Sequence, residues 1–104
     1  MRTFIFIYRN PTRCAPTHET SAAMKAWFDG MGERLAELGK PVVASDTVGN
    51  CSPGTTELNG YSIVQAENLA GALAIAKECP HLTRNGGIEV GELGEVPGPS
   101  RLTA

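Results

Sequence analysis

The stretch GYSIVQAENLAGALAIAKECPHLTRNGGIEV, residues 60–90, decides the fold that this sequence predicts. Residues 61–66 follow a glycine and are rich in β-branched and aromatic side chains, which favours a strand. After them the apolar residues take the i, i+3, i+4, i+7 spacing of one helix face, namely Leu69, Ala72, Leu73 and Ala76. This change of period predicts a strand followed by a helix.

The ends of that helix, and the strand beyond it, are marked by residues with suitable chemistry. Asn68 is the predicted N-cap, because its side-chain oxygen can accept from the free amides of the first turn. Pro80 is the predicted end, because a proline disfavours the helical conformation of the residue before it. Gly86 and Gly87 then turn the chain into a strand over residues 88–93. The stretch therefore predicts one half of a split βαβ arrangement.

The N-terminal part of the sequence predicts a second unit of the same kind. Residues 3–8 are the strongest predicted strand, with apolar side chains on both faces. An amphipathic helix of about five turns follows, with an apolar stripe of Met24, Trp27, Phe28, Met31, Leu35 and Leu38. Gly39 and Pro41 are predicted to end this helix, and residues 42–44 to form a short strand. Residues 46–59 are predicted to be a loop or a loose hairpin with little core material.

The predicted order is βαβ followed by βαβ, which is the ferredoxin-like α+β arrangement. It consists of a four-stranded antiparallel sheet with two helices on one face. The other face would be bare. Residues 3–8 nevertheless carry apolar side chains on both sides, so both faces of this strand should be packed against other groups. Because exposed apolar patches usually mark interfaces, we expect a homodimer that pairs through this bare face of the sheet.

Composition narrows the class of protein. The 104 residues carry a net charge of −2, and the nine Lys and Arg residues are scattered, which argues against nucleic-acid binding. The longest apolar run, residues 4–8, is too short to cross a bilayer, so no membrane association and a cytoplasmic location are expected. We expect one domain over residues 1–94 and an extended or partly disordered tail over residues 95–104.

Cysteine and histidine spacing gives no indication of a metal site. The three cysteines form no CxxC pair, and the two histidines are well separated in the sequence. We therefore expect neither a bound metal nor a cofactor.

Several segments together resemble the YCII-related (DGPF) family. They are IYR at residues 7–9, WF at 27–28, LGK at 38–40, GYSI at 60–63, QAENL at 65–69, CPHL at 79–82 and GGIEV at 86–90. The resemblance implies a ferredoxin-like fold that dimerises into an α+β barrel, with a pocket between sheet and helices or at the subunit interface. Many members of the family have no assigned activity, some are linked to the regulation of sigma factors, and enzymatic members use a histidine with an acidic residue.

Two departures from the family pattern affect what the resemblance implies about function. The DGPF tetrapeptide is absent, and the corresponding region reads DTVGN at residues 46–50. The histidine that enzymatic members carry in the first helix is also absent, since residues 19–38 contain none. The catalytic pair of those members is therefore not implied for this chain.

His81, in the CPHL segment, is the candidate catalytic residue. As a general acid or base, an imidazole suits work near neutral pH. Its alternative role is structural, because a histidine at a helix end commonly stabilises that end or binds a loop carbonyl. Asp29 and Asp46 become acidic partners only if the fold brings them close.

Four further residues are candidates for ligand binding: Tyr8, Trp27, Tyr61 and Arg84. The two tyrosines lie at predicted strand ends, where the hydroxyl can reach a pocket while the ring packs. Trp27 belongs to the helix stripe, and Arg84 could bind an anion. Core packing of the three aromatic residues and a solvated surface charge at Arg84 are the simpler interpretations.

Two hypotheses of function follow, from different classes. In the first, the protein is a dimer that binds a small organic molecule, with weak lyase-type or isomerase-type acid–base chemistry through His81. In the second, it is a non-catalytic regulatory or protein-interaction module that uses the fold as a dimerisation platform.

Overall fold

The structure is a computed structural model that describes residues 1–11, 18–51, 54 and 56–95. Its four strands form one antiparallel sheet in the order β2-β3-β1-β4. The strands are β1 (Arg2–Asn10), β2 (Leu35–Glu37), β3 (Glu57–Ala66) and β4 (Gly87–Glu92). The helices are α1 (His18–Met31) and α2 (Leu69–Ala76), with the short 3-10 helices η1 (Gly32–Arg34) and η2 (Pro80–Arg84). This confirms the predicted ferredoxin-like fold.

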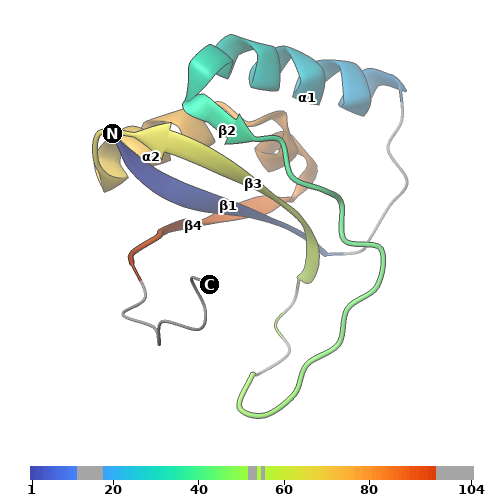
Figure 1. Cartoon of the computed structure of the whole chain (residues 1–104). Coiled ribbons are helices and arrows are strands. Elements are labelled where there is room, and N and C mark those ends of the chain that lie inside the picture. The colour runs from blue at the N-terminus through green and yellow to red at the C-terminus, as the bar shows by residue number, and fades with distance from the viewer. Residues whose placement is uncertain (12–17, 52–53, 55, 96–104) are drawn as a thin grey trace.

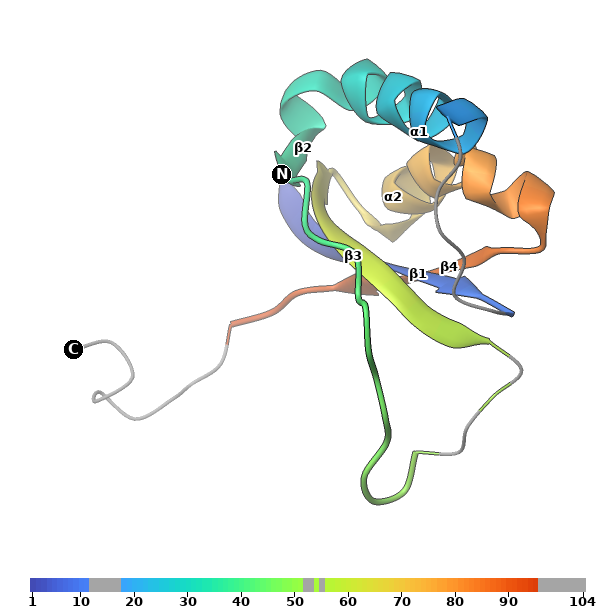
Figure 2. The same ribbon diagram turned by 90° about the vertical axis from the view of Figure 1, so that its right-hand side faces the viewer.

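Both helices cover the same face of the sheet (Figure 2). The central strands β1 and β3 place alternate side chains on that face, and Phe6 lies opposite Ser62. The buried core consists of Phe4, Phe6, Tyr8, Met31, Val64, Ala66, Ala72, Ala76 and Cys79. Alternation along two strands therefore supplies most of the core, and the helices close it from one side.

The opposite face of the sheet has no helix over it among the described residues (Figure 1). Ile5 and Ile7 of β1 and Tyr61 and Ile63 of β3 lie on this face and are only partly buried. In register, Ile5 lies opposite Ile63 and Ile7 opposite Tyr61. The four side chains form one continuous apolar surface, which we call the open-face patch.

The predicted first helix is wrong in its C-terminal part. α1 ends at Met31, because Gly32 takes a left-handed backbone conformation with φ +58° and turns the chain away from the helix axis. Leu35 belongs to β2, where it lies opposite Val64, and Leu38 is 57% exposed. The helical spacing continued past the helix end because a strand that returns to the same core also needs an inward-facing leucine.

The predicted second strand, residues 42–44, is also wrong. The chain leaves β2 alongside β3, where the Tyr61 amide donates to the Lys40 carbonyl and the Val42 amide to the Asn59 carbonyl. Gly39, with φ +79°, lies against the Tyr61 carbonyl where a Cβ would clash. Gly39 therefore permits close contact between two backbones, and it is not the stop signal of a helix.

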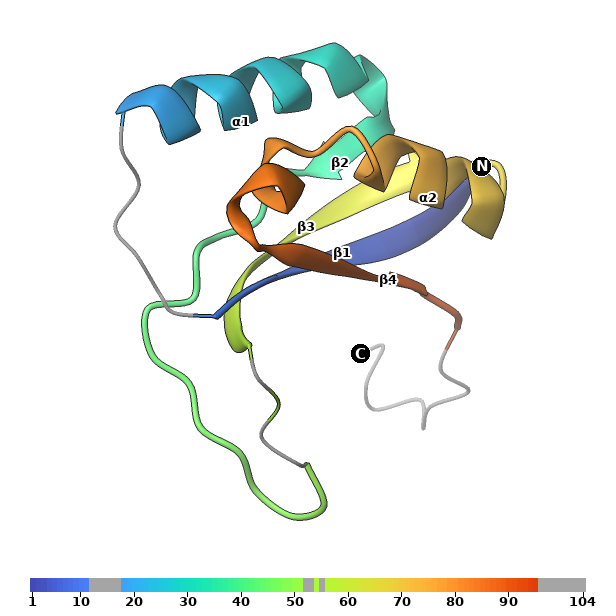
Figure 3. The same cartoon turned by 180° about the vertical axis from the view of Figure 1, so that it is seen from behind.

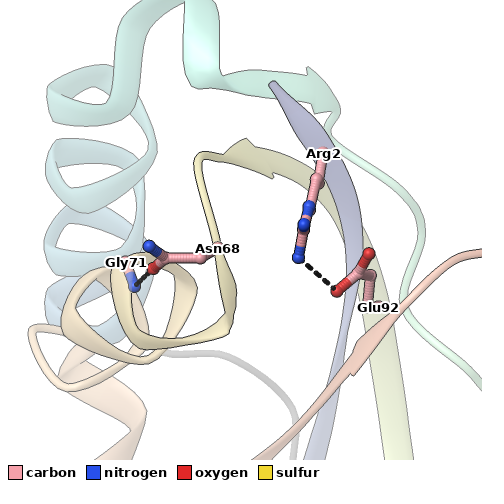
Figure 4. A network of polar contacts seen from close by, with 4 residues as sticks. All are labelled: Arg2, Asn68, Gly71 and Glu92. Carbon is pink, nitrogen blue, oxygen red and sulfur yellow. Dashed lines mark hydrogen bonds and ion pairs between the residues drawn. The ribbon is translucent and has the colours of Figure 1, made fainter.

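The second half of the chain follows its prediction more closely. Asn68 caps α2, accepting a hydrogen bond from the Gly71 amide at 2.8 Å (Figure 4). The helix ends at Ala76, four residues before Pro80, because Cys79 is already extended as the residue before a proline. Pro80 instead begins η2, which leads into β4 (Figure 3).

The predicted apolar stripe of α2 is only half buried. Ala72 and Ala76 pack against the sheet, whereas Leu69 and Leu73 are 46% and 41% exposed. β4 covers residues 87–92, one residue earlier at each end than the predicted 88–93. β3 begins at Glu57, four residues before the predicted start at residue 61. The predicted tail lies, beyond Glu95, outside the described residues, and no described helix is long and apolar enough to span a membrane.

Candidate functional site

His81 lies in η2 and presses against the end of the central strand β1. Its ring meets the ring of Tyr8 edge-on, with centroids 5.9 Å apart and planes at 62°. The Nε2 atom of the ring is buried and has no hydrogen-bond partner.

Asn10, the last residue of β1, has a second buried polar atom without a partner, its side-chain Oδ1. Gly86 joins the two residues in space, because a Cβ built on it would clash with both Asn10 Oδ1 and His81 Cδ2. We call His81, Asn10 and Gly86 the η2 site. Asn10 is absent from the sequence-based candidates, and only its place before Pro11 at the end of a strong strand could have drawn attention to it.

The backbone around the η2 site is held by hydrogen bonds. The amides of Asn85 and Gly86 both donate to the His81 carbonyl, the second at 3.1 Å. Asn85 has φ +62°, a left-handed conformation that asparagine tolerates better than most residues. The turn from η2 into β4 therefore holds Gly86 against the His81 ring.

Burial controls the charge state of the titratable groups around the site. Desolvation lowers the pKa of His81, and the neighbouring Arg9 backbone opposes this in part, so the imidazole is neutral at pH 7. Burial also raises the pKa of the Cys79 thiol to about 11 and raises that of Tyr8 still further from its ordinary value. Neither of these two groups is an anion at neutral pH.

Tyr8 has its hydroxyl committed to an internal chain of hydrogen bonds. It donates to Ser62 Oγ at 2.8 Å, and Ser62 donates to the Leu38 carbonyl at 2.7 Å. The chain ties the buried centre of the sheet to the segment after β2. Tyr8 can therefore offer the η2 site its ring but not a free hydroxyl.

Trp27 lies in the same aromatic cluster as Tyr8. Their ring centroids are 6.2 Å apart and nearly perpendicular, and Phe6 stacks on Trp27 at the same distance. The Trp27 Nε1–H donates to the Ile75 carbonyl at 3.1 Å and so links α1 to α2. The fold thus brings three of the five candidate residues together, in the order His81, Tyr8, Trp27.

The other two candidates lie elsewhere. Tyr61 is on the open face of the sheet, opposite Ile7, and Arg84 is an exposed residue at the end of η2. The possible acidic partners are also separate from His81. Asp29 pairs with Lys25 at 2.7 Å on the exposed side of α1, and Asp46 accepts from the Thr47 amide.

A groove of about 320 Å³ opens at the surface where α1 and η1 approach α2. Its lining is Ala26, Trp27, Gly30, Met31, Arg34, Ile75 and Glu78. Trp27 is the one candidate residue in this lining, so the groove is separate from the η2 site. Among residues 1–11, 18–51, 54 and 56–95, no three His, Cys, Asp or Glu side chains gather in a way that would hold a metal ion.

Comparison with known proteins identifies the family. A family model described as YCII-related domain matches residues 1–96. Comparisons with curated proteins and with solved structures found no match. Because the family model spans nearly the whole chain, and the sheet order and helix placement agree with the fold that its sequence motifs imply, the chain belongs to the YCII-related family.

Proposed function

We propose that this protein is a homodimer that binds a small organic molecule at the η2 site, where His81 is placed to accept a proton. The observation that carries the proposal is that His81 Nε2 and Asn10 Oδ1 are buried, unpartnered polar atoms of two residues that both contact Gly86. Leaving a buried acceptor unpaired costs about 1–3 kcal/mol. Two such atoms on residues that contact the same glycine support a site that a bound molecule completes.

The chemistry that His81 can supply is that of a weak base. Its imidazole is neutral and its lowered pKa makes it a poor general acid at pH 7. Its described contacts are a ring, a backbone group and a glycine, and none of them is a carboxylate. Binding is therefore the primary function in this proposal, and acid–base turnover is secondary to it.

The open-face patch supports the dimer. Ile5, Ile7 and Ile63 stand beside Tyr61 on a face that no described helix covers. At its edge, Arg9 and Glu89 form an exposed ion pair at 3.4 Å. An apolar centre with a charged rim is the usual composition of a subunit interface.

A ligand screen tests the binding function directly. Thermal unfolding of the wild type, His81→Ala and Asn10→Ala is followed in the presence of a broad metabolite library, with Asn50→Ala as the matched control at an exposed asparagine. A ligand at a hundred times its dissociation constant adds about 2.7 kcal/mol to the free energy of unfolding. We expect at least one compound to stabilise the wild type and the control but neither of the other two variants.

A screen without such a compound would contradict the proposal and favour the second candidate, a protein-interaction module. The observation that favours a protein-interaction module is a pair of exposed leucines on α2, Leu69 and Leu73, which lie one helical turn apart. In that case Leu73→Ser would weaken capture of a partner protein, whereas His81→Ala would leave it unchanged.

A further inference from the structure

We infer that the groove between the two helices is a second binding site, and that it takes a small zwitterion with an apolar side chain, the class of the free apolar amino acids. The groove has a volume of about 320 Å³. Sites for small molecules span about 300–1,000 Å³, so this one suits a ligand of the size of a single amino acid. It is separate from the η2 site, and the inference does not depend on the function proposed there.

The hollow between the helices exists because α1 presents small residues to it. Ala26 and Gly30 both line the groove and lie four residues apart, on one face of the helix. A Cβ built on Gly30 would have no contact within 4 Å among the described residues. On the opposite wall the Ile75 carbonyl accepts a hydrogen bond from the Trp27 indole at 3.1 Å. The groove is therefore open space between two helices that a hydrogen bond joins.

The middle of the groove is apolar. Trp27, Met31 and Ile75 line it, and all three side chains are buried or partly buried. An apolar ligand group placed there removes apolar surface from water, on the protein and on itself, which favours binding. This part of the groove accordingly takes the side chain of the ligand.

Two side chains of opposite charge also line the groove, Arg34 from η1 and Glu78 from the segment after α2. Both residues are exposed. Neither has an ion-pair partner among the described residues, so they do not pair with each other although they line the same groove. The guanidinium is suited to a carboxylate and the carboxylate to an ammonium group.

The two charges together select a zwitterion. A phosphate or a dicarboxylate would be attracted by Arg34 but repelled by Glu78, and a diamine would meet the reverse. A molecule with one ammonium and one carboxylate pairs with both. Since exposed ion pairs are individually weak, binding should need both charges and the apolar side chain together.

The groove stays accessible in the proposed homodimer. Both helices lie on one side of the sheet, and the open-face patch lies on the other (Figure 2). A partner seated on the open-face patch therefore leaves the groove free to exchange its ligand with solvent.

Trp27 reports on the groove directly, because it is the single tryptophan of the sequence. Its indole N–H signal is followed by NMR in the full-length protein at pH 7 during titration with free leucine, 4-methylpentanoate, 3-methylbutylamine or glycine. The last three lack, in turn, the ammonium, the carboxylate and the apolar side chain of leucine. We expect leucine to shift the signal with a millimolar dissociation constant. The two singly charged compounds should bind at least about threefold more weakly, and glycine at least about tenfold.

Charge variants assign the two ends of the ligand. Arg34→Gln should weaken leucine about threefold or more but leave 3-methylbutylamine unchanged, and Glu78→Gln should weaken leucine but leave 4-methylpentanoate unchanged. The matched controls are Lys77→Gln and Glu33→Gln, which remove exposed charges outside the lining and should leave leucine binding unchanged. Equal binding of leucine and either singly charged compound to the wild type would overturn the zwitterion class.

A groove-filling variant tests the place of binding. Gly30→Leu puts a side chain into the open space, and leucine favours a helix more than glycine does, so the variant should fold. It should weaken free leucine at least about tenfold. Undiminished binding to Gly30→Leu, or no response of the wild type to leucine, would overturn the second site. His81→Ala should leave the titration unchanged, and loss of the response in that variant would place the ligand at the η2 site instead.

Discussion

The two faces of β1 carry side chains of the same kind but differ in what covers them. Phe4 and Phe6 point toward the helices and are fully buried, whereas Ile5 and Ile7 point the other way and stay partly exposed. With two helices on one side, the described chain has no third element for the second side (Figure 2). Apolar residues on both faces of a strand therefore predict a cover for each face, but they do not identify that cover.

The largest expected effect is on the covered face. Phe6→Ala should lower the free energy of unfolding by about 3–5 kcal/mol, because it leaves a cavity in a core that cannot collapse around it. Chemical denaturation at several protein concentrations measures this. The cost of Phe6→Ala should not depend on concentration, whereas that of Ile5→Ala on the open face should grow as the dimer forms. Equal and concentration-independent costs would remove the distinction between the faces.

Ile7→Lys places a charge in the open-face patch and leaves the buried core unchanged. In a two-fold symmetric pair the substitution places a charge at the interface twice. We expect association to weaken at least about a hundredfold, or about 3 kcal/mol. Light scattering coupled to size-exclusion chromatography at micromolar concentration should show a dimer for the wild type and a folded monomer for the variant. Val48→Lys, at a position 90% exposed, is the control, and a monomeric wild type would contradict the dimer.

A smaller effect is expected at Ser62, the buried hydroxyl between Tyr8 and the Leu38 carbonyl. Ser62→Ala removes the partner of both groups and should cost about 1–3 kcal/mol in the free energy of unfolding. Thr83→Ala, which removes an exposed hydroxyl that donates to the Pro80 carbonyl, should cost less than about 0.5 kcal/mol. Similar costs for the two variants would show that the chain from Tyr8 to Leu38 does not stabilise the covered face.

The smallest expected effect is the pH dependence caused by His81. Its pKa is lower in the folded protein than the ordinary 6.5, so between the two values the unfolded chain binds more protons. The free energy of unfolding should therefore be highest above pH 6.5. It should fall as the pH drops from 6.5 to the lower pKa of the folded protein. His81→Gln should flatten this part of the profile, measured by urea denaturation from pH 5 to pH 8. An unchanged slope would show that His81 is not buried as a neutral imidazole.

The two halves of the chain differ in how well their sequences predict their structure. In the second half, period, capping and turn signals agree, and Asn68, β3 and β4 lie where they are expected or close to it. In the first half, one apolar stripe crosses two elements, because Leu35 of β2 faces the same core as α1. Local spacing could not locate the break. The positive φ of Gly32, which ends the helix, becomes evident only in the folded chain.

The candidate site was predictable only in part. His81 stood out because its segment is distinctive and an imidazole has useful chemistry near pH 7. Asn10 did not, since its significance depends on lying beside a residue seventy-one positions later in the sequence. No local pattern records that a side-chain oxygen will be buried without a partner, because burial depends on what the rest of the chain places around it.

The sequence by itself determined the ferredoxin-like order of strands and helices, the family, and the need of β1 for a cover on both faces. These properties follow from hydrophobic period and turn chemistry, which act over a few residues. Only the tertiary structure decided where α1 ends, which face of the sheet stays open, and that His81, Asn10 and Gly86 meet. These features depend on contacts between distant segments, and such contacts exist only after the chain has folded and its backbones have come within packing distance.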